Sequence, residues 1–150
     1  AVLGRGARHV LSINGEVVPF LCETIAQFGA QNDIETHVQN TTHPRTRLSP
    51  ICEVQLVRVM HEALANVRQH AQADNLWVSF EENGSGLQVA IRDDGVGFVE
   101  QALDKHFGLN TMRERAESVH GSLTIDSTPG QGTQFLFTLP LNQTNISYHP

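Results

Sequence analysis

Several features that would place a chain of 150 residues in a specialised class are scarce in this sequence. Its two cysteines, Cys22 and Cys52, are too few for a disulfide framework, which favours a reducing, cytoplasmic location. No apolar run approaches the roughly 18 residues of a membrane helix, and no secretory signal is visible. The net charge of −6 argues against a general nucleic-acid binder, because such proteins usually carry a basic surface. The eight histidines are scattered, so no structural metal site is expected.

The length suits a single domain, and 39% hydrophobic residues are enough to build a core. We expect this core between about residues 17 and 140, with irregular ends at 1–16 and 141–150. The sequence starts without an initiator methionine, which predicts a processed chain or a piece of a longer protein.

Hydrophobic spacing predicts three helices and about five strands. Apolar residues at helical intervals predict helices over residues 17–30, 50–72 and 109–120, and alternation predicts strands near 33–38, 76–81, 87–93, 123–125 and 133–139. Most of these strands follow one another through hairpin turns. The predicted fold class is therefore α+β: a two-layer α/β sandwich, with a mixed, mostly antiparallel sheet covered on one face by three helices.

A carboxylate continues the core-facing row of the strand that ends at Asp93. The apolar residues that alternate from Leu87 to Ile91 share a face with Asp93, because successive side chains of a strand point to opposite sides. Burying a carboxylate is costly unless it is hydrogen-bonded or paired. The glycines that follow, Gly95 and Gly97, would let the backbone approach a ligand closely. A plain acid-glycine turn is the alternative.

A hydroxyl continues the apolar row of the last strand in the same way. Thr133 has the parity of Phe135 and Phe137, although a buried threonine can also satisfy itself on local backbone. A buried acid and a buried hydroxyl at matching strand ends could together read the exocyclic amine and the ring nitrogen of adenine. Asp94 has the opposite parity from Asp93, so we expect it to face solvent or stabilise the turn.

Oxygen-bearing side chains lie one turn apart on the second predicted helix. Glu62 and Asn66 present a carboxylate and a carboxamide on one face, which we expect roughly opposite the core. Both offer hard oxygen atoms suited to Mg²⁺ that is held jointly with substrate phosphates. The alternative is a solvated helix face.

The third predicted helix begins at Gly108 and Leu109. Its free N–H groups and its dipole would favour a phosphate. Lys105 and His106 precede it and could supply positive charge, or they could be an exposed loop pair.

The order of these motifs resembles that of bacterial sensor histidine kinases over roughly residues 17–140. Residues 61–71 are similar to the family's asparagine box, and residues 93–98 to its first glycine box. Residues 108–116 resemble the second glycine box in the form typical of the nitrate/nitrite-sensor subfamily. Residues 121–123, residues 127–133 and the final predicted strand resemble the closing segment.

The resemblance implies a Bergerat-type ATP-binding fold and an enzyme, a protein-histidine kinase. It would donate the γ-phosphate of ATP to a histidine on a separate dimerisation domain, for relay to an aspartate of a response regulator. Asn66 would coordinate the Mg²⁺ bound to the triphosphate. Glu62 would be the general base or acid beside the γ-phosphate, and could also contact the metal through water.

The same resemblance assigns the nucleotide contacts. Asp93 would accept from the adenine amine, in a pocket shaped by Gly95, Gly97 and Thr133. The backbone at residues 108–109 would close over the phosphates, and residues 98–107 would form a lid over ATP.

Two departures from the family pattern stand out. The family usually has Lys or Arg immediately before the final His-Ala of the asparagine box, whereas this chain has Gln69. Arg68 lies about 100° round the helix from that position, so His70 or Lys105 would contribute instead. The phosphoacceptor helix is absent, so the isolated domain is expected to be a monomer and its parent a homodimer, often anchored in the inner membrane with this domain on the cytoplasmic side.

Two other readings remain open at this point. A degenerate nucleotide-sensing module without phosphotransfer is favoured by Gln69. A serine kinase of the anti-sigma type would share the fold, but the segment at residues 108–116 is more typical of sensor kinases.

Overall fold

The computed structural model describes residues 17–44, 46–84, 86–99 and 108–141. Its helical elements are α2 (Val17–Asn32), α3 (Pro50–Asn66), a π-helical turn η1 (Val67–Ala71) that continues α3, and α5 (Leu109–Glu117). The hydroxyl of Ser49 accepts the N–H of Cys52 at 3.3 Å and Pro50 occupies the first turn of α3, and both residue types are common at these positions of a helix. Within the described residues, no helix has the length and apolar character needed to cross a membrane.

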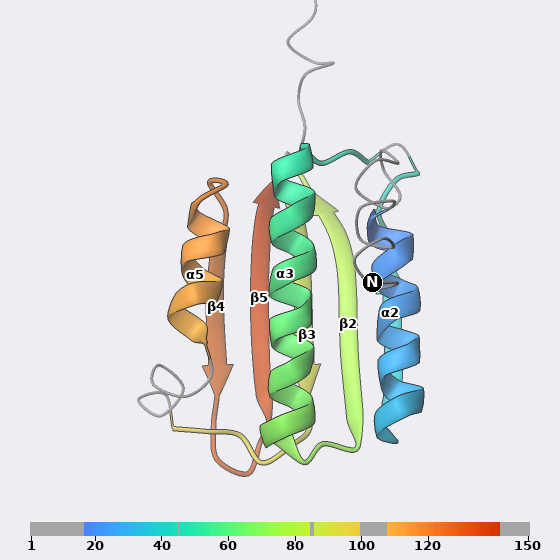
Figure 1. Cartoon of the computed structure of the whole chain (residues 1–150), viewed down its shortest axis with the longest axis vertical. Coiled ribbons are helices and arrows are strands. Elements are labelled where there is room, and N and C mark those ends of the chain that lie inside the picture. Colours follow the sequence, from blue (N-terminus) through green and yellow to red (C-terminus); the bar gives the residue numbers. More distant parts are fainter. Residues whose placement is uncertain (1–16, 45, 85, 100–107, 142–150) are drawn as a thin grey trace, which may run out of the picture.

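Five strands form one sheet in the order β1-β2-β3-β5-β4. Their bounds are β1 Glu35–Asn40, β2 Asn75–Asn83, β3 Gly86–Asp93, β4 Ser122–Ser127 and β5 Thr133–Pro140. The edge strand β1 runs parallel to β2, and the other neighbouring pairs are antiparallel. All three α-helices lie on one face of the sheet (Figure 1), so the predicted α+β two-layer sandwich is confirmed.

The core lies between the helices and the sheet. It contains Leu21 and Ile25 from α2, Met60 from α3 and Phe80 and Phe137 from the sheet, all without measurable exposure. The alternating buried pattern of β3 and β5 follows from this one-sided cover, because only one face of each strand meets the helices.

The ends of several helices and strands lie together at one end of the sandwich. Figure 1 shows that the C-terminal ends of α3 and β3, the start of β5 and the N-terminal end of α5 lie at the same end. Side chains that are distant in sequence therefore meet there.

Candidate functional site

Asp93 and Thr133 lie directly opposite each other on the neighbouring strands β3 and β5. Each has 4% of its surface exposed, and both continue the rows that face the helices. The burial of both side chains was predicted from strand parity and is confirmed.

Hydrogen bonds within the protein offset only part of the cost of burying the Asp93 carboxylate. Its Oδ1 accepts the backbone N–H of Gly95 at 2.8 Å. Burial raises the pKa of Asp93 above its ordinary value, and the hydrogen bond from Gly95 opposes that rise. A buried acceptor of this kind would gain from a ligand that donates a hydrogen bond.

The neighbouring acid has a structural role. Asp94 is exposed, and its Oδ1 accepts the backbone N–H groups of Asp74 at 3.0 Å and Asn75 at 2.8 Å, while its Oδ2 accepts from the side chain of Asn75 at 3.0 Å. Desolvation acts to raise the pKa of Asp94, but the hydrogen bonds from Asn75 and Asp74 outweigh it and lower that pKa. Asp94 thus faces solvent, as one of the two expectations for it stated, and its hydrogen bonds stabilise the start of β2.

The hydroxyl of Thr133 is paired with a side chain that sequence reasoning missed. Its Oγ1 lies 2.7 Å from Oγ of Ser127 on β4, rather than on local backbone. Ser127 Oγ also accepts the backbone N–H of Phe98 at 2.8 Å. The parity rule could have found Ser127, because it continues the row of Leu123 and Ile125 on β4.

Asn66 joins Asp93 and Thr133 in lining a narrow cavity of about 10 Å³. The other lining residues are Val67, Ala71, Phe98 and Phe135. Asn66 is 8% exposed, so the expectation that its face lies roughly opposite the core is wrong for this residue. The segment after β3 passes close to the end of η1, where Val96 donates its N–H to Ala71 O at 2.7 Å.

Glu62 remains on the exposed face, one turn before Asn66. Its carboxylate lies beside the start of α5, because a Cβ built at Gly108 would meet Glu62 Oε1 at 2.6 Å. Gly108 caps that helix with a φ of 68°, which suits glycine. The site therefore brings a carboxylate, a carboxamide and the N–H groups of a helix start to one end of the fold.

The remaining residues proposed for the phosphates differ in their placement. The side chain of Leu109 is fully buried in the core, so only its backbone is available at the start of α5. Lys105 and His106 lie outside the described residues, as does the lid apart from residues 98–99. Among the described residues, no group of three or more His, Cys, Asp or Glu could hold a metal ion by itself.

The departure at Gln69 lies at an exposed position of η1. Gln69 and Arg68 are both exposed, whereas His70 is half-buried. The imidazole of His70 packs edge-on against the ring of Phe98, with the centroids 6.3 Å apart. Since Phe98 lines the cavity, His70 supports the cavity wall.

The two glycines after Asp93 are required by chain packing. A Cβ at Gly95 would lie 2.1 Å from Ala71 O, and one at Gly97 would lie 2.0 Å from Thr128 O. Gly97 also has a φ of 68°. These contacts within the protein account for both glycines without the close ligand approach that the sequence suggested.

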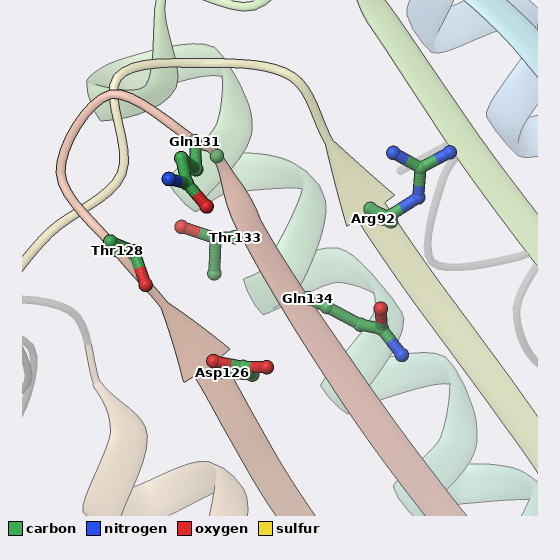
Figure 2. A pocket seen from close by; sticks show the side chains of 7 residues that line it. Arg92, Asp126, Thr128, Gln131, Thr133 and Gln134 are labelled. Atoms are coloured by element: carbon green, nitrogen blue, oxygen red, sulfur yellow. The ribbon is translucent and has the colours of Figure 1, made fainter.

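A second hollow, of about 120 Å³, lies on the helix-free face of the sheet. Figure 2 shows Arg92, Gln134 and Asp126 on the three neighbouring strands there, and they are paired in register. The guanidinium of Arg92 stacks over Trp77 at 3.9 Å. Thr133 lines this hollow too. Its acid, Asp126, is exposed, so the hollow lacks the buried acid that distinguishes the cavity at Asp93.

Residues 52–143 match the family model described as histidine kinase-, DNA gyrase B-, and HSP90-like ATPase. An uncharacterised sensor-like histidine kinase from Chloroflexus aurantiacus is 38% identical over 69% of this chain and 19% of its own length. The nitrate/nitrite sensor protein NarQ from Escherichia coli is 39% identical over 60% of this chain and 16% of its own length. The chain thus spans about a fifth of these relatives.

The solved structures agree on the fold. The histidine kinase domain of a blue-light-activated histidine kinase from Erythrobacter litoralis superposes with a TM-score of 0.71. The match covers 87% of this chain and 63% of that domain, at 20% sequence identity.

Proposed function

The chain belongs to the family of histidine kinase-, DNA gyrase B- and HSP90-like ATPases, and we propose that it is the ATP–Mg²⁺-binding catalytic domain of a sensor histidine kinase. It transfers the γ-phosphate of ATP to a histidine on a separate dimerisation domain of the same kinase, for relay to a response-regulator aspartate. The observation that carries this proposal is the buried pair Asp93 and Thr133, which line one cavity with Asn66.

Adenine occupies the cavity at Asp93 in this proposal. The carboxylate accepts a hydrogen bond from the adenine amine, which relieves the cost of its burial. A cavity of about 10 Å³ offers room for no more than a single water. Binding therefore requires the side chain of Phe98, which lines the cavity, to move outward.

In this proposal the phosphates of ATP lie between α3 and α5. The N–H groups at the start of α5, from Leu109 onward, would hold phosphate oxygens, with Lys105 and His106 adding positive charge. Asn66 would supply a hard oxygen to Mg²⁺, Glu62 would contact the ion through water, and the phosphates would supply further ligands, which is how proteins usually hold this ion. When bound, Mg²⁺ neutralises charge on the triphosphate.

Glu62 is the proposed general base or acid beside the γ-phosphate. Its exposed carboxylate lies beside Gly108, where it can exchange a proton with an incoming imidazole. Phosphoryl transfer depends mainly on positioning and charge stabilisation, so the contribution of Glu62 is orientation and proton transfer at its Oε atoms.

The proposed subfamily, cellular location and oligomeric state rest on the sequence motifs and on the similar proteins. We assign the chain to the nitrate/nitrite-sensor subfamily because residues 108–116 have its form and NarQ is among the relatives. The domain would work on the cytoplasmic side, as a monomer when isolated and within a homodimeric parent.

A nucleotide-sensing module without phosphotransfer is the second candidate. Gln69 favours it, because an uncharged side chain stands where the family usually has a cation. Both candidates require ATP binding, and only the kinase produces phosphohistidine.

The test has two steps. Calorimetry first measures ATP–Mg²⁺ binding by the wild-type chain, Asp93→Asn and Asn66→Ala; unchanged affinity in both variants would reject the site. The chain is then mixed with the dimerisation domain and γ-labelled ATP. Binding without acid-labile phosphate on that domain would favour the sensing module.

A further inference from the structure

The hydroxyl of Ser127 contacts two residues that line the cavity, Phe98 and Thr133. Its Oγ lies 2.8 Å from Phe98 N, 2.7 Å from Thr133 Oγ1 and 3.3 Å from Gly132 O. The backbone N–H of Phe98 can only donate, so Ser127 accepts there. A serine hydroxyl carries a single proton, which leaves Thr133 and Gly132 competing for it.

The distances favour Thr133 as the acceptor of that proton. Hydrogen bonds between two oxygens are ordinarily about 2.5–3.0 Å long. The contact with Thr133 lies within this range, and the contact with Gly132 lies beyond it. When Ser127 donates to Thr133, the proton of Thr133 itself remains free to be donated into the cavity.

The cavity then offers one acceptor and one donor side by side. Ionised Asp93 can only accept, and Thr133 donates. An aminopurine presents the matching edge, an amine N–H beside an unprotonated ring nitrogen. An oxopurine presents the reverse, a carbonyl oxygen beside a ring N–H.

We infer that Ser127 is a positioning residue that fixes Thr133 as a donor and so contributes to the selection of aminopurine over oxopurine nucleotides. The inference rests on the proposed function, because it concerns the same nucleotide site. Ser127 acts through Thr133 and does not itself line the cavity. The same oxygen also holds the backbone of Phe98, whose side chain lines the cavity.

The two strands that carry this pair provide a matched control. Ser122 and Thr138 are a second serine–threonine pair on β4 and β5, with their hydroxyls 2.6 Å apart. Both pairs lie directly opposite in register. Strand parity places Ser122 on the helix-free face, so its removal costs a similar hydrogen bond without touching the cavity.

The test compares dissociation constants for ATP and inosine triphosphate in the wild-type chain, Ser127→Ala, Ser127→Thr and Ser122→Ala. Loss of one neutral hydrogen bond, about 1 kcal/mol, should lower the preference for ATP about fivefold in Ser127→Ala. Ser127→Thr keeps a hydroxyl and should retain most of the preference, and Ser122→Ala should retain all of it.

Two results would overturn the inference. In the first, Ser127→Ala keeps the same preference for ATP over inosine triphosphate as the wild type. In the second, Ser122→Ala loses as much of that preference as Ser127→Ala does. Either result leaves the proposed function intact if the wild-type chain binds ATP. A wild-type chain that binds neither nucleotide would reject the proposed function and the inference together. If Ser127→Ala does not fold, Ser127→Cys offers a near-isosteric side chain with weaker hydrogen bonding and should show the same loss.

Discussion

Replacing Asp93 with asparagine should weaken ATP binding while leaving the fold at least as stable. The amide keeps an oxygen that can accept the N–H of Gly95, which Asp93 Oδ1 accepts at 2.8 Å. It also removes the cost of burying a charge, which raises the pKa of the acid. The thermal midpoint at neutral pH should therefore stay the same or rise.

The loss of affinity follows from the charge of the acceptor. A hydrogen bond to a charged group contributes about 1.5–3 kcal/mol, which corresponds to a dissociation constant about 10- to 150-fold higher. Isothermal calorimetry with ATP–Mg²⁺ measures this change, and a thermal melt of the same samples measures stability.

Asp94→Asn is the matched control, because it makes the same chemical change one residue away. Asp94 accepts three hydrogen bonds from Asp74 and Asn75 outside the cavity. This variant should lower stability by about 1 kcal/mol and leave ATP affinity nearly unchanged. Equal affinities for the wild type and Asp93→Asn would refute the role given to Asp93, and so would a stability loss in Asp93→Asn as large as that in Asp94→Asn.

Three further outcomes are expected. Burial raises the pKa of Asp93 in the folded chain, so the stability that this carboxyl contributes should be present at low pH and be lost as pH rises through that pKa. ATP affinity should instead fall as pH is lowered toward the same pKa, because the protonated carboxyl is a poorer acceptor. Calorimetry and thermal melts across pH, with Asp93→Asn as the non-titrating reference, check the pH dependence of affinity and of stability. Gly97→Ala should cost more than about 2 kcal/mol in urea unfolding, because it adds a clash with backbone to a positive φ, while Gly130→Ala at a φ of 84° with nothing within 4 Å should cost only about 1–2 kcal/mol. Glu62→Gln should bind ATP nearly as well as the wild type but lose phosphotransfer by about 10²–10⁴-fold in a labelled-ATP assay, and an unchanged rate would contradict its role.

Strand periodicity carried most of the correct sequence prediction. Asp93 and Thr133 were identified because each continues an apolar row on a strand that is covered on one side only. The same rule applied to β4 would have identified Ser127, which was overlooked because its row contains only Leu123 and Ile125 before it. Parity is thus informative wherever a polar residue ends a buried row.

The burial of Asn66 could not be read from helix periodicity. That pattern places the side chain away from the apolar stripe, but it does not reveal that residues 93–98 pass close to the last turn of the helix. The π-helical turn that starts at Val67 also changes the direction of later side chains, and nothing in the local sequence marked it. The parallel pairing of β1 with β2 likewise depends on long-range contacts.

Phosphohistidine formation tests the central claim most directly. The chain is incubated with γ-labelled ATP, Mg²⁺ and the phosphoacceptor domain of the same kinase, and acid-labile, alkali-stable label on that domain is measured over time. We predict label that requires the chain and that falls with Asp93→Asn when the ATP concentration is kept below the dissociation constant of that variant. Saturable ATP binding without any labelled histidine would contradict the claim that this ATP-binding domain is a kinase.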